Sequence, residues 1–68
     1  MRITVNGKPR EIEREMQLPD FLRAHEIDPR LVAVAINGEV VPREQYDQVR
    51  VRAGDTLEVV RMVGGGAA

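Results

Sequence analysis

The most restrictive feature of this 68-residue chain is a pair of Asn-Gly dipeptides set between short runs of alternating residues. At Asn6-Gly7, apolar Ile3 and Val5 alternate with polar neighbours before the dipeptide, and a second alternating run follows it. A two-residue type I′ turn needs positive φ at both central positions, which Asn-Gly adopts readily. The chain is therefore predicted to open with an antiparallel hairpin. Because Pro9 cannot donate a ladder hydrogen bond, we expect the second strand at a sheet edge.

A short amphipathic helix is predicted over residues 18–27. Apolar residues recur there at spacings of three and four, and they are Leu18, Phe21, Leu22 and Ala24. Pro19 suits the first helical turn, where its missing N–H has no intrahelical partner. The helix should end before Pro29, because a residue that precedes proline is pushed out of the α region.

The remaining segments are predicted to complete a sheet. The apolar stretch 31–37, "LVAVAIN", is expected to be the central strand, covered on both faces. The second Asn-Gly pair, at 37–38, ends it with a turn, and an irregular or single-turn connection starts at Pro42. Residues 49–51 form a short strand, and Gly54 offers positive φ for a turn before the last strand, 56–63. One helix across a mixed sheet of four or five strands is a two-layer α+β domain.

Composition places the chain among single-domain globular proteins. Hydrophobic residues make up 43% and charged residues 31%, which is enough apolar surface to build a core. Cysteine is absent, so neither disulfides nor thiolate zinc sites hold the fold. A net charge of -1 with interleaved acids and bases, and only two aromatics, argue against nucleic-acid binding. No segment resembles a membrane span or a signal sequence, so we expect no membrane association and a cytoplasmic location.

The body of the chain carries no recognisable catalytic or metal-binding set. Neither serine nor cysteine occurs in it. The single histidine, His25, falls near the predicted helix end and is typical of a surface residue beside the negative end of the helix dipole. Glu11, Glu13 and Glu15 alternate with arginines as on a solvated strand face, and without a histidine or cysteine among them we expect no metal site.

The last residues are three glycines followed by two alanines. We predict a domain over residues 1–63 and a flexible tail over 64–68. Taken alone, such a segment is equally typical of a frayed end or an expression scar. Glycine has no Cβ, however, so a glycine segment can thread a narrow channel and approach a nucleotide closely. Three extended glycines reach about 10 Å beyond the last strand.

Val60 and Met62 lie on one side of the last predicted strand. If these side chains are exposed, they form an apolar docking site beside the tail, and methionine can adapt to more than one partner. If they are buried, they are ordinary core residues. The sequence leaves both interpretations open.

Several segments together resemble the ThiS family of sulfur carrier proteins, which are small ubiquitin-like β-grasp domains. They are the "VNGK" hairpin, "INGEVVPREQY", the "GD" turn and the Gly-Gly end. The resemblance covers residues 1–66 and implies a β-grasp fold. It also implies that the protein is a co-substrate and not an enzyme, without a bound cofactor of its own.

The resemblance assigns the chemistry to the tail. It implies that an E1-like adenylating enzyme uses ATP to activate the carboxylate of Gly66, which Gly64 and Gly65 present, and that the activated group becomes a thiocarboxylate. A cysteine desulfurase or a similar donor would supply the sulfur. Thiazole synthase would accept it for the thiazole ring of thiamine.

The chain departs from the family pattern after Gly66. Ala67 and Ala68 would move the carboxylate roughly 7 Å further out and place methyl groups where only glycine fits. We therefore expect a peptidase to remove both alanines before activation.

Alternative functions remain open at this stage. Carriers with the same tail chemistry feed molybdopterin, homocysteine or cysteine synthesis, or tRNA thiolation. In a ubiquitin-like modifier the activated glycine would be joined to a target lysine. A non-covalent β-grasp binding module would need no tail at all.

Overall fold

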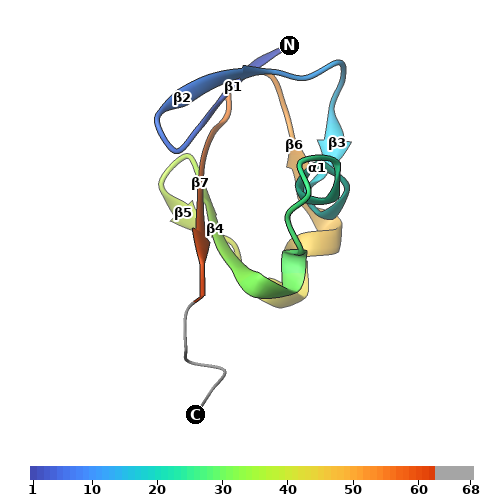
Figure 1. Cartoon of the computed structure of the whole chain (residues 1–68), viewed down its shortest axis with the longest axis vertical. Helices are drawn as coiled ribbons and strands as arrows, with labels where there is room; N and C mark the ends of the chain where they lie inside the picture. The colour runs from blue at the N-terminus through green and yellow to red at the C-terminus, as the bar shows by residue number, and fades with distance from the viewer. Residues whose placement is uncertain (63–68) are drawn as a thin grey trace.

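A mixed sheet of five strands, with one α-helix across it, forms the body of the protein (Figure 1). The computed structural model describes residues 1–62. The sheet order is β2-β1-β7-β4-β5, and these strands are β1 (Arg2–Val5), β2 (Lys8–Glu11), β4 (Val32–Ile36), β5 (Glu39–Val40) and β7 (Thr56–Arg61). β1 and β7 run parallel, whereas the other neighbouring pairs are antiparallel. The predicted two-layer α+β fold is confirmed.

The other elements connect the strands and cover one face of the sheet. Two short strands, β3 (Met16–Gln17) and β6 (Arg50–Val51), pair with each other away from the main sheet. The remaining elements are the helix α1 (Leu18–Ala24) and the 3₁₀ segments η1 (Pro29–Leu31) and η2 (Arg43–Gln48). Within residues 1–62, no helix is long and apolar enough to cross a membrane.

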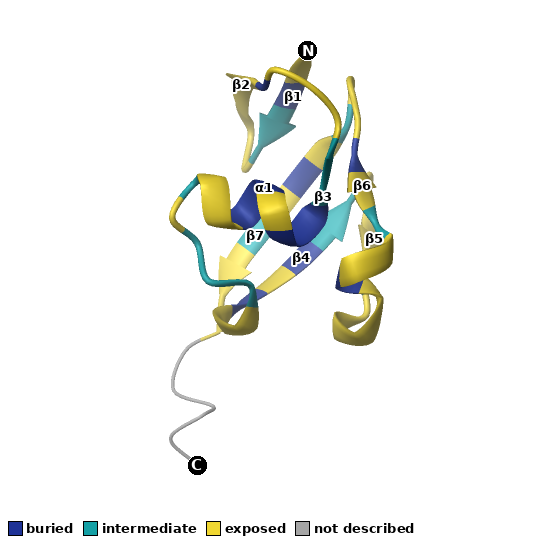
Figure 2. Cartoon of the chain, turned by 90° about the vertical axis from the view of Figure 1, so that its right-hand side faces the viewer, coloured by how far each residue is buried: buried dark blue, intermediate teal, exposed yellow. Residues whose placement is uncertain are grey.

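The core lies between α1 and the sheet. Figure 2 shows α1 crossing one face, with its buried residues turned toward the strands. The buried hydrophobic residues come from nearly every element and are Ile3, Ile12, Leu18, Phe21, Leu22, Val32, Val34, Tyr46, Val51 and Leu57. Burial on this one face, at about 25 cal/mol per Å² of apolar surface, is the main favourable term in folding.

Both Asn-Gly pairs form the predicted turns. Asn6 and Gly7 have φ values of 52° and 81°, and Asn37 and Gly38 have 53° and 86°. The hairpin predicted at Asn6-Gly7 and the turn predicted at Asn37-Gly38 are therefore confirmed, and the second turn also joins an antiparallel pair, β4 and β5. β2 lies at a sheet edge, as the position of Pro9 predicts.

The asparagine side chains do more than permit the turns. The Val59 backbone N–H donates to Asn6 Oδ1 at 2.9 Å, and Asn6 Nδ2 donates to the Val59 carbonyl at 3.2 Å. This amide therefore continues the β1–β7 pairing past the end of β1, as a further strand residue would. Asn37 likewise accepts a hydrogen bond from the Thr56 backbone N–H at 3.0 Å.

The helix is shorter than predicted and ends at Ala24. Glu26 has a φ of 61°, its N–H donates to the Arg23 carbonyl, and the Ile27 N–H donates to the Leu22 carbonyl at 2.8 Å. These two bonds are those of a Schellman motif, which satisfies the last carbonyls and reverses the chain. The motif ends the helix before the proline signal is reached, and a glutamate at the left-handed position gives no warning in the sequence.

The prediction for residues 31–37 was wrong in two respects. β7, not β4, is the central strand of the sheet. β4 is also covered on one face only, since Val32 and Val34 are buried while Ala33 is exposed. The apolar run reflects a buried valine face and an open alanine face on the same strand.

Candidate functional site

β7 carries the chain toward the predicted tail. It ends at the far end of the molecule from the N terminus (Figure 1). The Met62 N–H donates to the Leu31 carbonyl at 2.8 Å, which fixes the last described residue against the start of β4. The predicted tail residues lie outside the described residues, as does the predicted domain boundary at 63, and they are Gly64, Gly65, Gly66, Ala67 and Ala68.

Val60 and Met62 are both exposed, with 62% and 52% of their surface accessible. They are therefore not core residues, and of the two interpretations left open by the sequence only the exposed one agrees with the structure. Val60 lies on the sheet face opposite α1, because its neighbours on β7, Leu57 and Val59, turn toward the core.

This open face is hollowed by its own side chains. A depression of about 200 Å³ is bordered by Ala33, Val34, Ala35, Val40, Glu58 and Val60. In the strand register Ala33 faces Val60, and Ala35 faces Val40. Two small alanines thus lie between two valines that are 62% and 75% exposed. We call this surface the open apolar face, defined by Ala33, Ala35, Val40 and Val60.

A contiguous apolar surface of this kind is unusual for a small protein unless something binds there. Glu58, opposite Ala35 in the register, adds one carboxylate to the border of the depression. The arrangement can hold an apolar side chain of a partner, and it can supply no proton transfer or nucleophile at its floor. Its chemistry is suited to packing against an apolar group.

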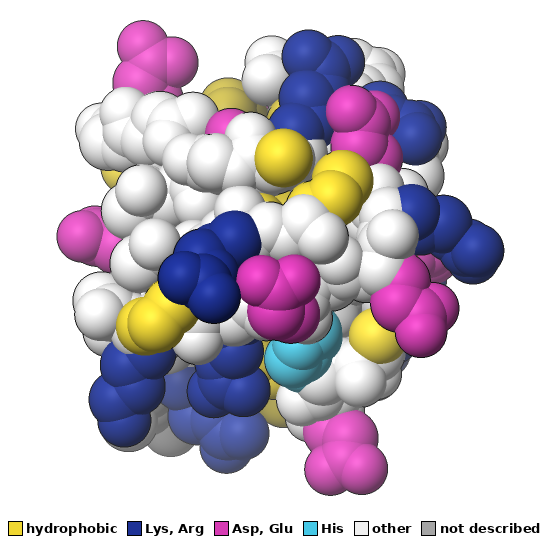
Figure 3. Space-filling model, turned by 90° about the horizontal axis from the view of Figure 1, so that it is seen from above, with side chains coloured by type: hydrophobic (Ala, Val, Ile, Leu, Met, Phe, Trp, Pro, Cys, Tyr) yellow, Lys and Arg dark blue, Asp and Glu magenta, His cyan; other side chains and the backbone are white. Residues whose placement is uncertain are grey.

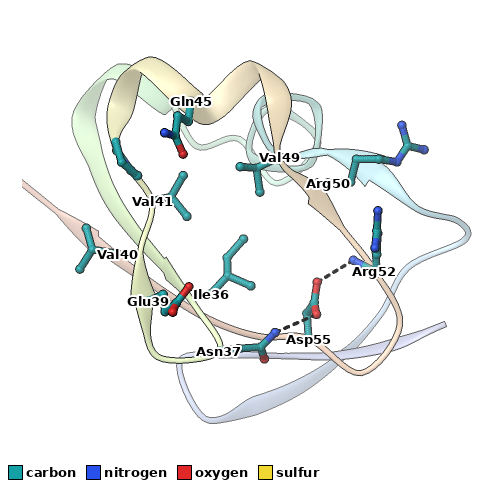
Figure 4. Close-up of a pocket in the computed structure, with 11 residues that line it drawn as sticks. Ile36, Asn37, Glu39, Val40, Val41, Gln45, Val49, Arg50, Arg52 and Asp55 are labelled. Atoms are coloured by element: carbon teal, nitrogen blue, oxygen red, sulfur yellow. Dashed lines mark hydrogen bonds between the residues drawn. The ribbon is translucent and has the colours of Figure 1, made fainter.

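A second depression, of about 440 Å³, lies between β5, η2 and β6 (Figure 4). Its polar groups already serve the local turns. The Asp55 carboxylate accepts hydrogen bonds from Asn37 Nδ2 at 3.1 Å and from the Arg52 backbone N–H at 2.8 Å. Arg50 forms an ion pair with Glu15 at 3.3 Å. We assign these groups a structural role, because each holds neighbouring loops together.

Charges around the helix are interspersed and solvated. Figure 3 shows acidic and basic side chains side by side around the single histidine, His25. His25 is half-buried at the end of α1, with Nδ1 3.0 Å from the Phe21 carbonyl oxygen. These contacts agree with a helix-end residue, as predicted. In residues 1–62, no three His, Cys, Asp or Glu side chains gather as a metal site would require.

Two carboxylates have lowered pKa values, each because of a neighbouring arginine. A side-chain hydrogen bond from Arg30 lowers the pKa of Asp28 to about 2, and the Arg30 backbone N–H bond adds to the effect. A side-chain hydrogen bond from Arg2 lowers the pKa of Glu11. Asp28 caps η1, so its charge contributes to holding the segment to which Met62 is bonded.

Comparison with known proteins gives one family. The model of the ThiS family matches residues 3–66, a range that ends on Gly66. A crystal structure of a thiamine biosynthesis protein (ThiS) from Geobacter metallireducens superposes with a TM-score of 0.84 at 36% identity, covering 97% of this chain and 100% of that one. This likeness confirms the β-grasp fold.

The sequence relatives include a protein of similar length and longer enzymes. The sulfur carrier protein ThiS of Bacillus subtilis is 29% identical over 65 residues, which are 94% of this chain and 98% of that protein. A thiazole synthase of Paramagnetospirillum magneticum is 40% identical over 67 residues, which are 98% of this chain but 21% of that protein. The chain spans about a fifth of the length of the thiazole synthases that it matches.

Proposed function

The chain belongs to the ThiS family, the sulfur carriers of thiamine biosynthesis, and we propose that Gly66 is the residue that carries the sulfur, as a thiocarboxylate. The observation that carries this assignment is the extent of the family match, which runs to Gly66 and no further. A protein of this family is a carrier that other proteins act on, and it is not itself a catalyst.

The proposed chemistry needs a carboxylate that is accessible to ATP and then to a sulfur nucleophile in an enzyme's active site. A free carboxylate is a poor acyl donor at neutral pH. In the first step a carboxylate oxygen of Gly66 attacks the α-phosphorus of ATP, and pyrophosphate leaves. In the second step the outer sulfur of a donor persulfide attacks the acyl carbon and AMP leaves. A thiol then attacks the donor's sulfur in the resulting acyl disulfide, forms a disulfide with it and releases –COS⁻. Gly64 and Gly65 suit this route because they have no Cβ to collide with the walls of an enzyme channel.

The adenylating partner in this proposal is an E1-like enzyme, which binds the ATP. A cysteine desulfurase or a similar protein supplies the sulfur, and thiazole synthase accepts it. The thiazole synthase of P. magneticum supports the last assignment, because a segment similar to this chain makes up about a fifth of that protein. A segment similar to this chain and a thiazole synthase thus belong to one polypeptide there.

We propose that the open apolar face and Met62 dock this carrier on its partners. Among residues 1–62, Val60 and Met62 are the exposed large apolar residues nearest the tail in the sequence. A face that spans β7, β4 and β5 gives a partner a fixed orientation of the domain, while Gly64–Gly66 come shortly after β7 in the sequence. Docking and chemistry therefore use different parts of the chain.

We also propose that a peptidase removes Ala67 and Ala68 before activation. With both alanines present, the carboxylate that ATP must activate would belong to Ala68, and methyl groups would lie where the enzyme must approach the backbone closely. Removal leaves Gly66 as the terminal residue.

ATP–pyrophosphate exchange with the adenylating enzyme tests the proposal. We expect rapid exchange with a chain that ends at Gly66, and little with the chain that retains Ala67 and Ala68. Deleting Gly65 and Gly66 should abolish exchange. Equal exchange by all three chains would refute the assignment of Gly66. Protein-sized adducts in the same mixture would instead indicate a modifier.

A further inference from the structure

The end of β7 depends on a single neighbouring strand. In the parallel β1–β7 pair, only Thr56 and Leu57 of β7 have Cα partners, and the Asn6 side chain extends this support to Val59. Further along, Arg61 pairs with Val32 of β4, and the Met62 N–H donates to Leu31. The backbone at residues 29–32, where η1 passes into β4, is therefore the platform from which the chain departs.

One side chain of η2 clamps this platform. Arg43 Nη1 donates to the Pro29 carbonyl at 3.0 Å, and its Nη2 donates to the Val32 carbonyl at 3.2 Å. Nη2 also lies 3.9 Å from Met62 Sδ. The guanidinium carbon is 5.5 Å from the centre of the Tyr46 ring, and Tyr46 Oη donates to the same Val32 carbonyl at 3.0 Å. Arg43 thus contacts η1, β4 and the last described residue together.

The contact pattern is specific to arginine. Its planar guanidinium presents donors in a fixed fork, so two nitrogens can reach two carbonyls at once. A lysine ammonium carries its three donors on one nitrogen, so it cannot place a separate nitrogen against each carbonyl. The guanidinium lies over the ring of the buried Tyr46. This contact restricts the orientation of the fork toward the two carbonyls.

From this geometry we infer that Arg43 is a positioning residue for the carrier's reaction. By fixing the platform and Met62, it sets the direction in which the chain leaves the domain, and so the delivery of Gly66 to the adenylating site. The inference rests on the proposed function, since delivery has a meaning only if Gly66 is activated.

The inference separates two kinetic constants. Docking through the open apolar face governs how much carrier the enzyme binds, whereas the direction of departure governs how often the carboxylate meets ATP. A small misplacement of a reacting group can reduce turnover on the order of tenfold to a hundredfold. Loss of Arg43 should therefore lower kcat more than it raises KM.

Three variants test this, all made in the chain that ends at Gly66. Arg43→Met keeps an unbranched, flexible side chain without the donors, and Arg43→Lys keeps the charge without the fork. Arg52→Met is the matched control, because Arg52 is an exposed arginine at the second depression. Hydrogen exchange of the Met62 amide is measured without a partner. The reference for global unfolding is the amide of the fully buried Leu18, which donates to the Val49 carbonyl at 2.8 Å.

We expect Arg43→Met to speed Met62 exchange relative to Leu18 and to lower kcat on the order of tenfold, with KM within about twofold. Met62 exchange and kcat of Arg43→Lys should lie between those of Arg43→Met and of the unsubstituted chain. Both quantities in Arg52→Met should equal those of the unsubstituted chain. Unchanged Met62 exchange in Arg43→Met would overturn the inference. So would a raised KM at constant kcat, which would make Arg43 a docking contact. If the unsubstituted chain supports no exchange of pyrophosphate, the proposed function fails, while the Met62 amide still decides whether Arg43 holds the platform.

Discussion

Replacing Val60 with threonine removes apolar surface from the open apolar face and little else. The two side chains have nearly the same shape, and both are β-branched, so the strand conformation is retained. Val60 is exposed in the free protein. The substitution should therefore leave the stability of the domain almost unchanged and weaken its binding to the adenylating enzyme.

The size of the effect follows from the exposure of the side chain. Full burial of a valine side chain is worth about 1.5–3 kcal/mol. Since 62% of Val60 is accessible before binding, covering it in a complex contributes about 1–2 kcal/mol. Threonine forfeits most of this, and a factor of ten corresponds to about 1.4 kcal/mol. We expect the dissociation constant to rise roughly five- to twentyfold.

The neighbouring residue provides the control. Val59 is half-buried and packs against the core, so Val59→Thr buries a hydroxyl on the inner side of the same strand at a cost of about 1–2 kcal/mol. In a domain of this size that lowers Tm by roughly 4–15 °C. Binding by the folded fraction should not change.

Titration calorimetry with the adenylating enzyme and thermal unfolding by circular dichroism measure the two quantities on both variants. The reasoning requires Val60→Thr to lose affinity without stability, and Val59→Thr to lose stability without affinity. Unchanged affinity in Val60→Thr would show that the open apolar face is not the docking surface. A drop of more than a few degrees in its Tm would show that Val60 contributes to the core.

Three stability predictions, each checked by urea unfolding, concern local backbone features. Asn6→Gly keeps the turn but removes both side-chain bonds to Val59, so the free energy of unfolding should fall by about 1–3 kcal/mol; an unchanged midpoint would contradict this role. Glu26→Gly relieves a φ of 61° and should raise the free energy of unfolding by up to about 1 kcal/mol, whereas a loss would show that the glutamate side chain matters more than the conformation. Arg30 lowers the pKa of Asp28 from 3.8 to about 2, so the stability due to this charge is present above pH about 4 and lost as pH falls toward about 2. Asp28→Asn should therefore be less stable than the unsubstituted protein at neutral pH, with the difference narrowing through that range; a constant difference would contradict the assignment.

Features encoded within a few residues were predictable. The turns at Asn6-Gly7 and Asn37-Gly38 depend only on residues that tolerate positive φ. The single helix follows from the spacing of its apolar residues. Its end was not predictable, because Glu26 adopts a left-handed conformation without the usual glycine. β3 has two residues, too few for any alternation to be visible.

The prediction that β4 is covered on both faces was wrong because an exposed apolar face and a core have the same composition. Ala33 and Ala35 complete an apolar run in the sequence, and only the position of α1 decides which face of β4 is covered. The sequence therefore leaves Val60 and Met62 undecided between core and surface, and the three-dimensional arrangement resolves this. The Arg43 clamp was missed for a different reason. Its bonds go to backbone carbonyls at Pro29 and Val32, which any residue supplies and no pattern marks.

The central claim is that sulfur is carried by the C-terminal carboxylate of Gly66. Mass spectrometry of the C-terminal peptide, after reaction with the adenylating enzyme, ATP and a sulfur donor, tests it most directly. We expect a peptide that ends at Gly66 and has sulfur in place of one carboxylate oxygen. A peptide that remains an unmodified carboxylate, or sulfur found on any other residue, would contradict the account.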